Sequence, residues 1–455
     1  MTALPLAHGL GSVRDLPVPG WLFLYGAAIV LIVSFVALGA LWRRPLLERR
    51  AGGRSLPTPL QRLLLGPELR LLLGLVSAGL LALVFAAALA GDDSVGANIA
   101  PTFVFVVFWL GLVPVVVLLG DVWPALNPWR AAGAGVAWLL ERAGTRWVPP
   151  ARYPERWGCW PAAVLLLAFV TLELAYPDAD RPRTLAVAIL VYSWITWIAM
   201  ATFGSRAWLA NGEAFSVYFG LLSRLAPFAV RDGRVVARMP LSGLARADER
   251  PGTLPFVAVM LGSVAFDGFS RTAWWQNRLV RIQSSFGLDE LGRADLAAMA
   301  FNLAGLLAMV ALVALVFLLA LEGARAGTGR QEGLAPQFVS SLVPIALAYS
   351  VAHYFSLLVL QGQQARRLAS DPFGYGWDLL GTADWQPRLD LLTPNTIWYV
   401  QVGVLVVGHV LGLMLAHDRA VTLFRAPGVA LRSQYPMLVL MVGYTVGGLW
   451  LLSND

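Results

Sequence analysis

Three ionisable side chains that lie in apolar stretches are the best candidates for chemistry in this sequence: Glu173, Asp267 and His353. Ionisable groups inside a bilayer are costly, rare and usually functional. The order of the apolar stretches places all three toward the outer face of a membrane. Two carboxylates and an imidazole can relay a proton in catalysis or hold a divalent metal ion. We therefore predict a catalytic site of Asp267, His353 and Glu173, in which Asp267 and His353 are the metal ligands.

Two of these residues also have simpler interpretations. Asp267 and Arg271 are four positions apart, so a helix would place them on one face and allow an ion pair. Glu173 is about one turn from the end of its stretch, and its side chain can extend to water from there.

Two further histidines share one later stretch but do not predict a joint metal site. Eight residues separate His409 from His417, which on a helix gives about 12 Å of rise and roughly 80° of rotation. We expect His409 to hydrogen-bond Tyr349 at a similar depth. His417, next to Asp418 at the inner end of the stretch, is expected to stabilise the helix terminus.

The composition requires a membrane around these elements. Of 455 residues, 58% are hydrophobic and 13% are charged, and a soluble protein could not hide that much apolar surface from water. A helix needs about 20 apolar residues to cross the hydrocarbon layer. We predict an all-α polytopic helical bundle that forms a single transmembrane domain over residues 1–455. The ten predicted spans are residues 21–42, 69–90, 101–122, 158–176, 184–204, 254–269, 296–321, 338–360, 396–416 and 436–452.

The arginines predict the orientation of this bundle. The sequence has no lysine, and the loop after the first span carries Arg43, Arg44, Arg49, Arg50 and Arg54. Basic residues in short loops stay on the cytoplasmic side, and alternation from there leaves roughly two-thirds of the arginines inside. Both termini are then expected outside, in a bacterial inner membrane.

The sequence also predicts where three segments between the spans lie relative to the membrane. Apolar and charged residues recur with helical spacing in residues 129–143, which predicts an interfacial helix on the cytoplasmic surface. Residues 211–228 are apolar but carry Glu213 and Arg224, and they predict a second interfacial helix or a short re-entrant one. Residues 361–395 hold four aspartates and predict an outward loop that caps the site. Asp232 and Gly233 predict a hairpin turn.

Several function classes are disfavoured. No HExxH, P-loop, GxGxxG, GxSxG or HxH pattern appears, and four histidines are few for a two-metal hydrolase. Cys159 is the single cysteine, so an internal disulfide is excluded. The arginines are scattered without interleaved aromatics, which argues against nucleic acid as a partner. The expected partners are the lipid bilayer and a small apolar molecule, and the sequence names no protein partner.

Seven segments spread over nearly the whole chain resemble a family of polytopic bacterial membrane proteins labelled fenitrothion hydrolase. They are AHGLGSVRDLPVPGWLF, GDVWPALNPWR, GEAFSVYFGLLSRLAPF, LGSVAFDGFSRT, PIALAYSVAHYFSLLVLQGQ, SDPFGYGWDLLGTADW and LAHDRA. The resemblance implies a membrane-bound hydrolase of organophosphate triesters, which would release a nitrophenol. The resemblance assigns no catalytic residues to this chain. The predicted outward site and its divalent metal ion are therefore inferred only from the types and positions of Asp267, His353 and Glu173.

A transporter is the alternative function. Pro114 and Pro344 each interrupt a span within a Leu-Val-Pro step. If the ten spans divide five and five, these steps occupy matching third positions that run in opposite directions, as in a permease built from inverted repeats.

Overall fold

The computed structural model describes residues 20–287, 290–329, 333–388, 390–424 and 426–453, which form a bundle of α-helices. The elements that run through the bundle are α1 (Gly20–Leu41), α3 (Pro67–Ala90), α4 (Ile99–Pro101) with η1 (Thr102–Phe108) and α5 (Leu112–Leu119), α8 (Trp160–Ala175), α9 (Pro182–Phe203), α12 (Thr253–Ser270), α14 (Leu291–Thr328), α15 (Leu334–Phe338) with η5 (Val339–Leu342), α16 (Val343–Ser356) and η6 (Leu357–Gln361), α18 (Pro394–Leu423), and α20 (Tyr435–Ser453). The shorter helices are α2 (Thr58–Leu65), α6 (Trp123–Leu126), α7 (Pro128–Arg142), η2 (Glu155–Trp157), α10 (Ser205–Asn211), α11 (Ala214–Ser223), η3 (Ser242–Leu244), α13 (Ala273–Gln283), α17 (Gln364–Ser370) and α19 (Pro427–Arg432).

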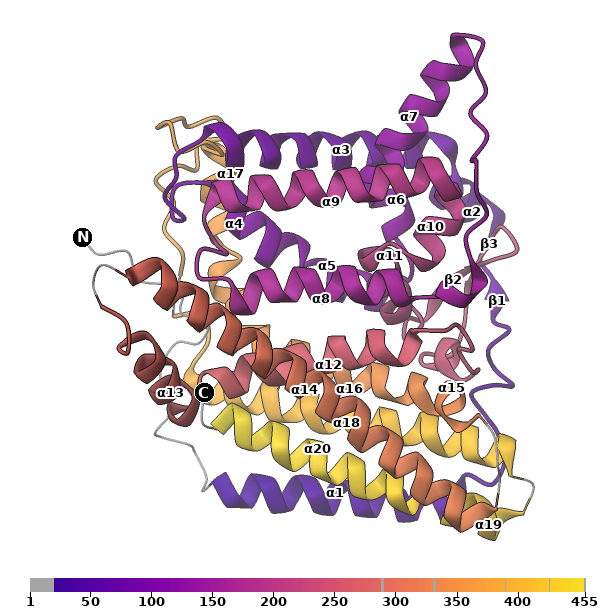
Figure 1. Ribbon diagram of the computed structural model, residues 1–455. Helices are drawn as coiled ribbons and strands as arrows, with labels where there is room; N and C mark the ends of the chain where they lie inside the picture. Colours follow the sequence, from indigo (N-terminus) through magenta and orange to yellow (C-terminus); the bar gives the residue numbers. More distant parts are fainter. Residues whose placement is uncertain (1–19, 288–289, 330–332, 389, 425, 454–455) are drawn as a thin grey trace.

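The chain is a multi-pass membrane protein. Within the described residues, eight helical stretches are long and apolar enough to cross a bilayer. The other two predicted spans contain α8, which has 16 residues, and α20. Figure 1 shows both lying alongside the longer helices, and it shows α1 beginning and α20 ending at the same end of the bundle. The predicted all-α polytopic fold is confirmed.

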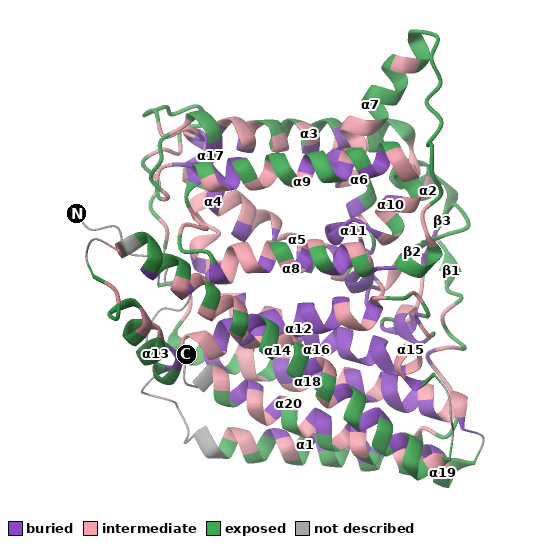
Figure 2. Cartoon of the chain, viewed as in Figure 1, coloured by how far each residue is buried: buried purple, intermediate pink, exposed green. Residues whose placement is uncertain are grey.

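The helices form two groups that meet at the centre. In Figure 1, α3, α9, α5 and α8 lie on one side of α12, and α16, α18, α20 and α1 lie on the other, while α14 crosses the bundle diagonally. Contacts of α12 with α8, α14 and α16 join the groups. Burial is concentrated in α12 and α16, whereas α1, α3 and α14 expose many apolar side chains, as expected of helices that face lipid (Figure 2).

A small sheet covers the arginine-rich end of the bundle. Its strands β1 (Arg54–Ser55), β3 (Arg234–Ala237) and β2 (Phe228–Arg231) are antiparallel in the order β1-β3-β2. Asp232 and Gly233 link β2 to β3 with φ angles of +49° and +72°. Two positive φ angles are typical of the tight hairpin turn that an Asp-Gly pair favours, so the predicted turn is confirmed.

The two segments predicted to be interfacial differ. Helix α7 leaves the bundle at the end where the sheet lies (Figure 1) and exposes Val136, Trp138 and Leu139, as an interfacial helix would. The interfacial interpretation of residues 211–228 is wrong. Eight of the ten residues of α11 are buried, because α11 folds inward against α5 and α8. This burial favours the short re-entrant alternative, which stays a prediction.

The loop at residues 361–395 packs on the turn between α3 and α4. The backbone carbonyl of Phe373 accepts a hydrogen bond from the Asp92 N–H at 2.8 Å, and that of Pro372 accepts one from the Ile99 N–H at 3.1 Å. The contacts fix this loop over the group that contains α3.

The helix irregularities do not follow the predicted inverted repeat. The π-helical turn η1 precedes Pro114 in the third span, whereas the π-helical turn η6 follows Pro344 in the eighth. An inverted repeat would place two equivalent turns at opposite membrane faces. Instead η1 and η6 pack against each other at one end of the bundle.

Candidate functional site

The structure brings Asp267 and His353 into direct contact inside the bundle. One carboxylate oxygen of Asp267, Oδ2, lies 2.8 Å from His353 Nε2 and accepts a 2.8 Å hydrogen bond from the Tyr354 hydroxyl. The other, Oδ1, accepts from Arg271 Nη2 at 2.9 Å and from its Nε at 3.2 Å. All four groups lie on α12 and α16 at the end where α12 terminates, and Asp267 is 4% exposed.

Local structure explains how these side chains meet. Asp267 lies in the last turn of α12 and Arg271 caps that helix, so the ion pair expected from their spacing forms. His353 and Tyr354 lie one turn before η6, where α16 changes to π-helical geometry. Such turns are frequent at functional sites.

Glu173 completes the predicted trio from a third helix. It lies near the end of α8, is partly buried, and interacts electrostatically with both Asp267 and Arg271. The three predicted site residues therefore gather at one place, from α8, α12 and α16. We call Glu173, Asp267, Arg271, His353 and Tyr354 the acidic cluster.

The acidic cluster is a poor cation site. Among the described residues, no group of three His, Cys, Asp or Glu side chains is arranged to hold a metal ion. A divalent ion next to Asp267 would also have to displace the guanidinium of Arg271, which already neutralises that carboxylate. The donor set suits proton exchange between carboxylate and imidazole better than metal binding.

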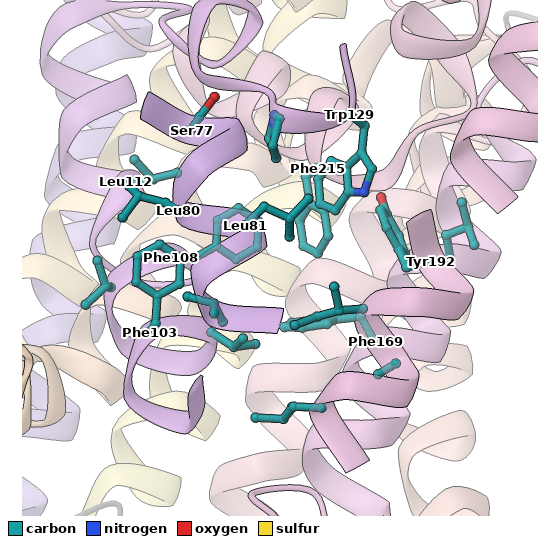
Figure 3. Close-up of a pocket in the computed structure, with 18 of the residues that line it drawn as sticks. Ser77, Leu80, Leu81, Phe103, Phe108, Leu112, Trp129, Phe169, Tyr192 and Phe215 are labelled. Carbon is teal, nitrogen blue, oxygen red and sulfur yellow. The ribbon is translucent and has the colours of Figure 1, made fainter. Parts of the chain in front are cut away.

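A large apolar cavity lies beside this cluster. It has a volume of about 460 Å³ and is bounded by α3, η1, α5, α6, α7, α8, α9 and α11. Figure 3 shows Phe103, Phe108, Phe169, Trp129 and Phe215 around it. No Asp, Glu, Arg or His lines the cavity, which is the size of sites that bind small molecules.

The few polar atoms around the cavity are mostly engaged. The Tyr192 hydroxyl donates to Glu213, and Trp129 Nε1 donates to Ser193 Oγ at 2.8 Å. Trp123 also lines the cavity and is 3% exposed, but its Nε1 has no hydrogen-bond partner among the described residues. A buried N–H without a partner is costly, and this atom has almost no surface exposed to the cavity.

Glu213 organises the inner end of the cavity. It is fully buried and caps α11, accepting hydrogen bonds from the backbone N–H groups of Phe215 at 2.9 Å and Ser216 at 2.8 Å. The side chain of Asn127 also donates to it, at 3.2 Å. Glutamate is not among the usual N-cap residues, so residue type alone did not predict this cap.

Helix α8 contributes to both the cavity and the acidic cluster. Phe169 lies on the cavity wall, and Glu173 follows it four residues later on α8. That spacing corresponds to about one turn, roughly 6 Å along the axis. The cavity and the cluster are therefore adjacent but distinct.

His409 and His417 have structural contacts. His409 Nδ1 bonds the carbonyl of Leu405, and the expected bond to Tyr349 is absent because the Tyr349 hydroxyl donates to the carbonyl of Tyr444. His417 contacts Gln434 and the carbonyl of Trp42 at the inner end of α18.

The aspartates of the loop at residues 361–395 lie outside the acidic cluster. Asp371 accepts from the N–H groups of Tyr375 and Gly376, and Asp378 accepts from Ser370 and the N–H of Ala383. The bond from Ser370 lowers the pKa of Asp378. These carboxylates shape the loop, because their bonds stay within it.

Comparisons of the chain with protein-family models, with curated proteins and with solved structures found no match.

Proposed function

We propose that the protein is a proton-linked carrier of a small uncharged apolar molecule in a bacterial inner membrane. The observation that carries this proposal is the apolar cavity of about 460 Å³, which lies one turn of α8 away from the acidic cluster. Ionisable groups within membrane helices often mark proton relays, and broken or re-entrant helices often surround the binding sites of carriers.

The charges of the acidic cluster favour proton exchange. Asp267 and Arg271 form an ion pair, and Glu173 is a further carboxylic acid beside this pair in a low-dielectric setting. Ionisation of Glu173 would add an uncompensated negative charge there, which is costly, so Glu173 is the group that would take up or release the proton. A change of charge at Glu173 would act on α8, whose neighbouring turn forms the cavity wall.

The cavity lining defines the class of the transported molecule. Its aromatic walls exclude charged solutes, because no charged side chain is present to pair with them. An uncharged aromatic compound that partitions into lipid meets this condition.

Binding and proton movement can be measured separately in proteoliposomes that contain pyranine as an internal pH probe. N-phenyl-1-naphthylamine serves as the apolar aromatic solute. We expect the wild type to bind this solute and to change the internal pH when it is added. Ala168→Trp, which fills the cavity, should abolish both effects, whereas Asp267→Asn should keep binding and lose the pH change.

Asp295→Asn is the matched control, because Asp295 is an exposed carboxylate on α14 outside the cluster. It should behave like the wild type. A pH change that persists in Asp267→Asn would contradict the proposal, and so would solute binding without any pH change in the wild type.

A hydrolase is the second candidate, favoured by the contact between Asp267 and His353. A carboxylate that orients an imidazole is the arrangement that prepares a general base for water, and Arg271 could stabilise a phosphoryl oxygen. Purified protein should then release nitrophenol from fenitrothion, and Asp267→Asn should abolish this release. A carrier would return the solute unchanged, which separates the two candidates.

A further inference from the structure

A second groove opens at the opposite membrane face from the acidic cluster, where α1 meets α18. Its volume is about 600 Å³. Ser34, Ala37, Leu38 and Leu41 of α1 form one wall, and Val410 and Met414 of α18 form the other. These wall residues belong to helices that are long and apolar enough to cross the bilayer, so the groove runs along the hydrocarbon layer.

Two arginines stand at the inner end of this groove. Arg43 and Arg44 both line it and are exposed, and they directly follow the last turn of α1. Arg43 Nε donates to the carbonyl of Ala40 at 3.2 Å. Neither arginine forms an ion pair with an acidic residue in the described parts of the chain. The groove therefore joins an apolar channel to two uncompensated positive charges.

The turn that carries the arginines is held rigidly by Asp418. This buried carboxylate accepts hydrogen bonds from Trp42 Nε1 at 2.9 Å and from the backbone N–H groups of Leu46 at 2.6 Å, Leu47 at 3.2 Å and Glu48 at 3.3 Å. His417 Nε2 lies 2.9 Å from the carbonyl of Trp42. A fixed turn lowers the entropic cost of ordering the arginines around a ligand.

We propose that this groove binds an anionic phospholipid, whose phosphate contacts Arg43 and Arg44 while an acyl chain lies along α1 and α18. Both parts of the groove match this occupant. The apolar walls at hydrocarbon depth fit an acyl chain, and paired basic residues at the cytoplasmic ends of membrane helices attract acidic headgroups. A free phosphate would leave the apolar channel unfilled, and an uncharged lipid would leave the arginines without a partner.

Native mass spectrometry of the full-length protein in detergent tests the proposal, with cardiolipin as the anionic probe and phosphatidylcholine as the uncharged one. We expect wild-type protein to retain cardiolipin selectively. The double variant Arg43→Gln, Arg44→Gln should bind cardiolipin about thirtyfold more weakly, because each arginine near an anionic surface contributes about fivefold. Ala37→Trp should also weaken binding, because its side chain would fill the channel.

The matched control is Arg49→Gln, Arg50→Gln, which removes the same charge from exposed positions in the same loop outside the groove. It should keep cardiolipin binding within about twofold of the wild type. Equal losses in the two double variants would show general electrostatic attraction and overturn the proposal. So would equal retention of the two lipids, or full displacement of cardiolipin by glycerol 3-phosphate, because a headgroup alone would then account for binding.

Discussion

Asp248 lies just before α12 at the arginine-rich membrane face and joins two segments through its carboxylate. Arg250 Nη2 contacts it at 2.6 Å and Arg224 Nη1 at 3.0 Å. Burial alone would raise the pKa of Asp248. The hydrogen bonds and charge of Arg250, together with the charge of Arg224, outweigh burial and hold this pKa well below its ordinary value of 3.8.

This depressed pKa makes stability depend on pH in a defined direction. A carboxylate with a lowered pKa in the folded state stabilises the fold above about pH 4, and the contribution is lost as the pH falls below that value. Asp248→Asn should therefore lower stability at pH 7 by about 3 kcal/mol, because it leaves two partly buried arginines without a counterion. The loss of stability caused by Asp248→Asn should be smaller at pH 3. Thermal unfolding in detergent at both pH values measures it.

Glu249→Gln is the control for this prediction, since Glu249 is the exposed neighbour of Asp248. Its unfolding temperature should follow that of the wild type at both pH values. A deficit of Asp248→Asn that stays constant from pH 7 to pH 3 would contradict the proposed ionic contribution.

Residue patterns predicted part of the acidic cluster. The bond between Asp267 and Arg271 follows from their spacing on one helix, and the shared depth of Asp267, His353 and Glu173 follows from the order of the spans. Tyr354 and the cavity around Trp123 could not be predicted, because span order gives the depth of a residue but not which helices are neighbours. Lateral contacts depend on packing between distant segments.

At the level of helices, α16 and α18 pack closely through a glycine. A Cβ added at Gly408 would lie 2.2 Å from the Cβ of Ala348 and 2.9 Å from the carbonyl oxygen of Pro344. Real side chains do not come so close, and small residues at such crossings let helix backbones approach in membranes. Gly408 therefore sets the distance between two central helices.

Gly408→Val should push α16 and α18 apart and lower stability by about 3 kcal/mol. Gly403→Val lies on the same helix, where an added Cβ meets no atom within 4 Å, and should be nearly neutral. Thermal unfolding of the two purified variants in detergent measures the difference. Equal unfolding temperatures would show that the crossing tolerates a larger side chain.

The hydrophobic pattern predicted the membrane helices well but failed for α11. A run of apolar residues between two spans can lie on the membrane surface or fold inward, and both choices bury it away from water. Glu213 explains why α11 folds inward. Its carboxylate accepts hydrogen bonds from backbone N–H groups at the helix start and from the side chains of Asn127 and Tyr192, so it can be buried.

The whole molecule has a predicted direction in the membrane, which cysteine labelling can test. In a Cys159→Ala background, single cysteines replace Ser94, in the turn before α4, and Thr145, after α7; both positions are exposed. An impermeant maleimide should label Ser94→Cys in intact cells and Thr145→Cys only after cell disruption. The reverse pattern would invert the topology and place the acidic cluster toward the cytoplasm.

Helix α1 is synthesised long before the helices on which it packs. This helix packs on α18 and α20, and Trp42 bonds Asp418, which lies 376 residues further along the chain. During synthesis α1 is therefore surrounded by lipid, without α18 and α20, until most of the polypeptide has been inserted. Ribosomes that stall before α18 would leave an early helix permanently unpaired, a state that membrane quality-control proteases can recognise.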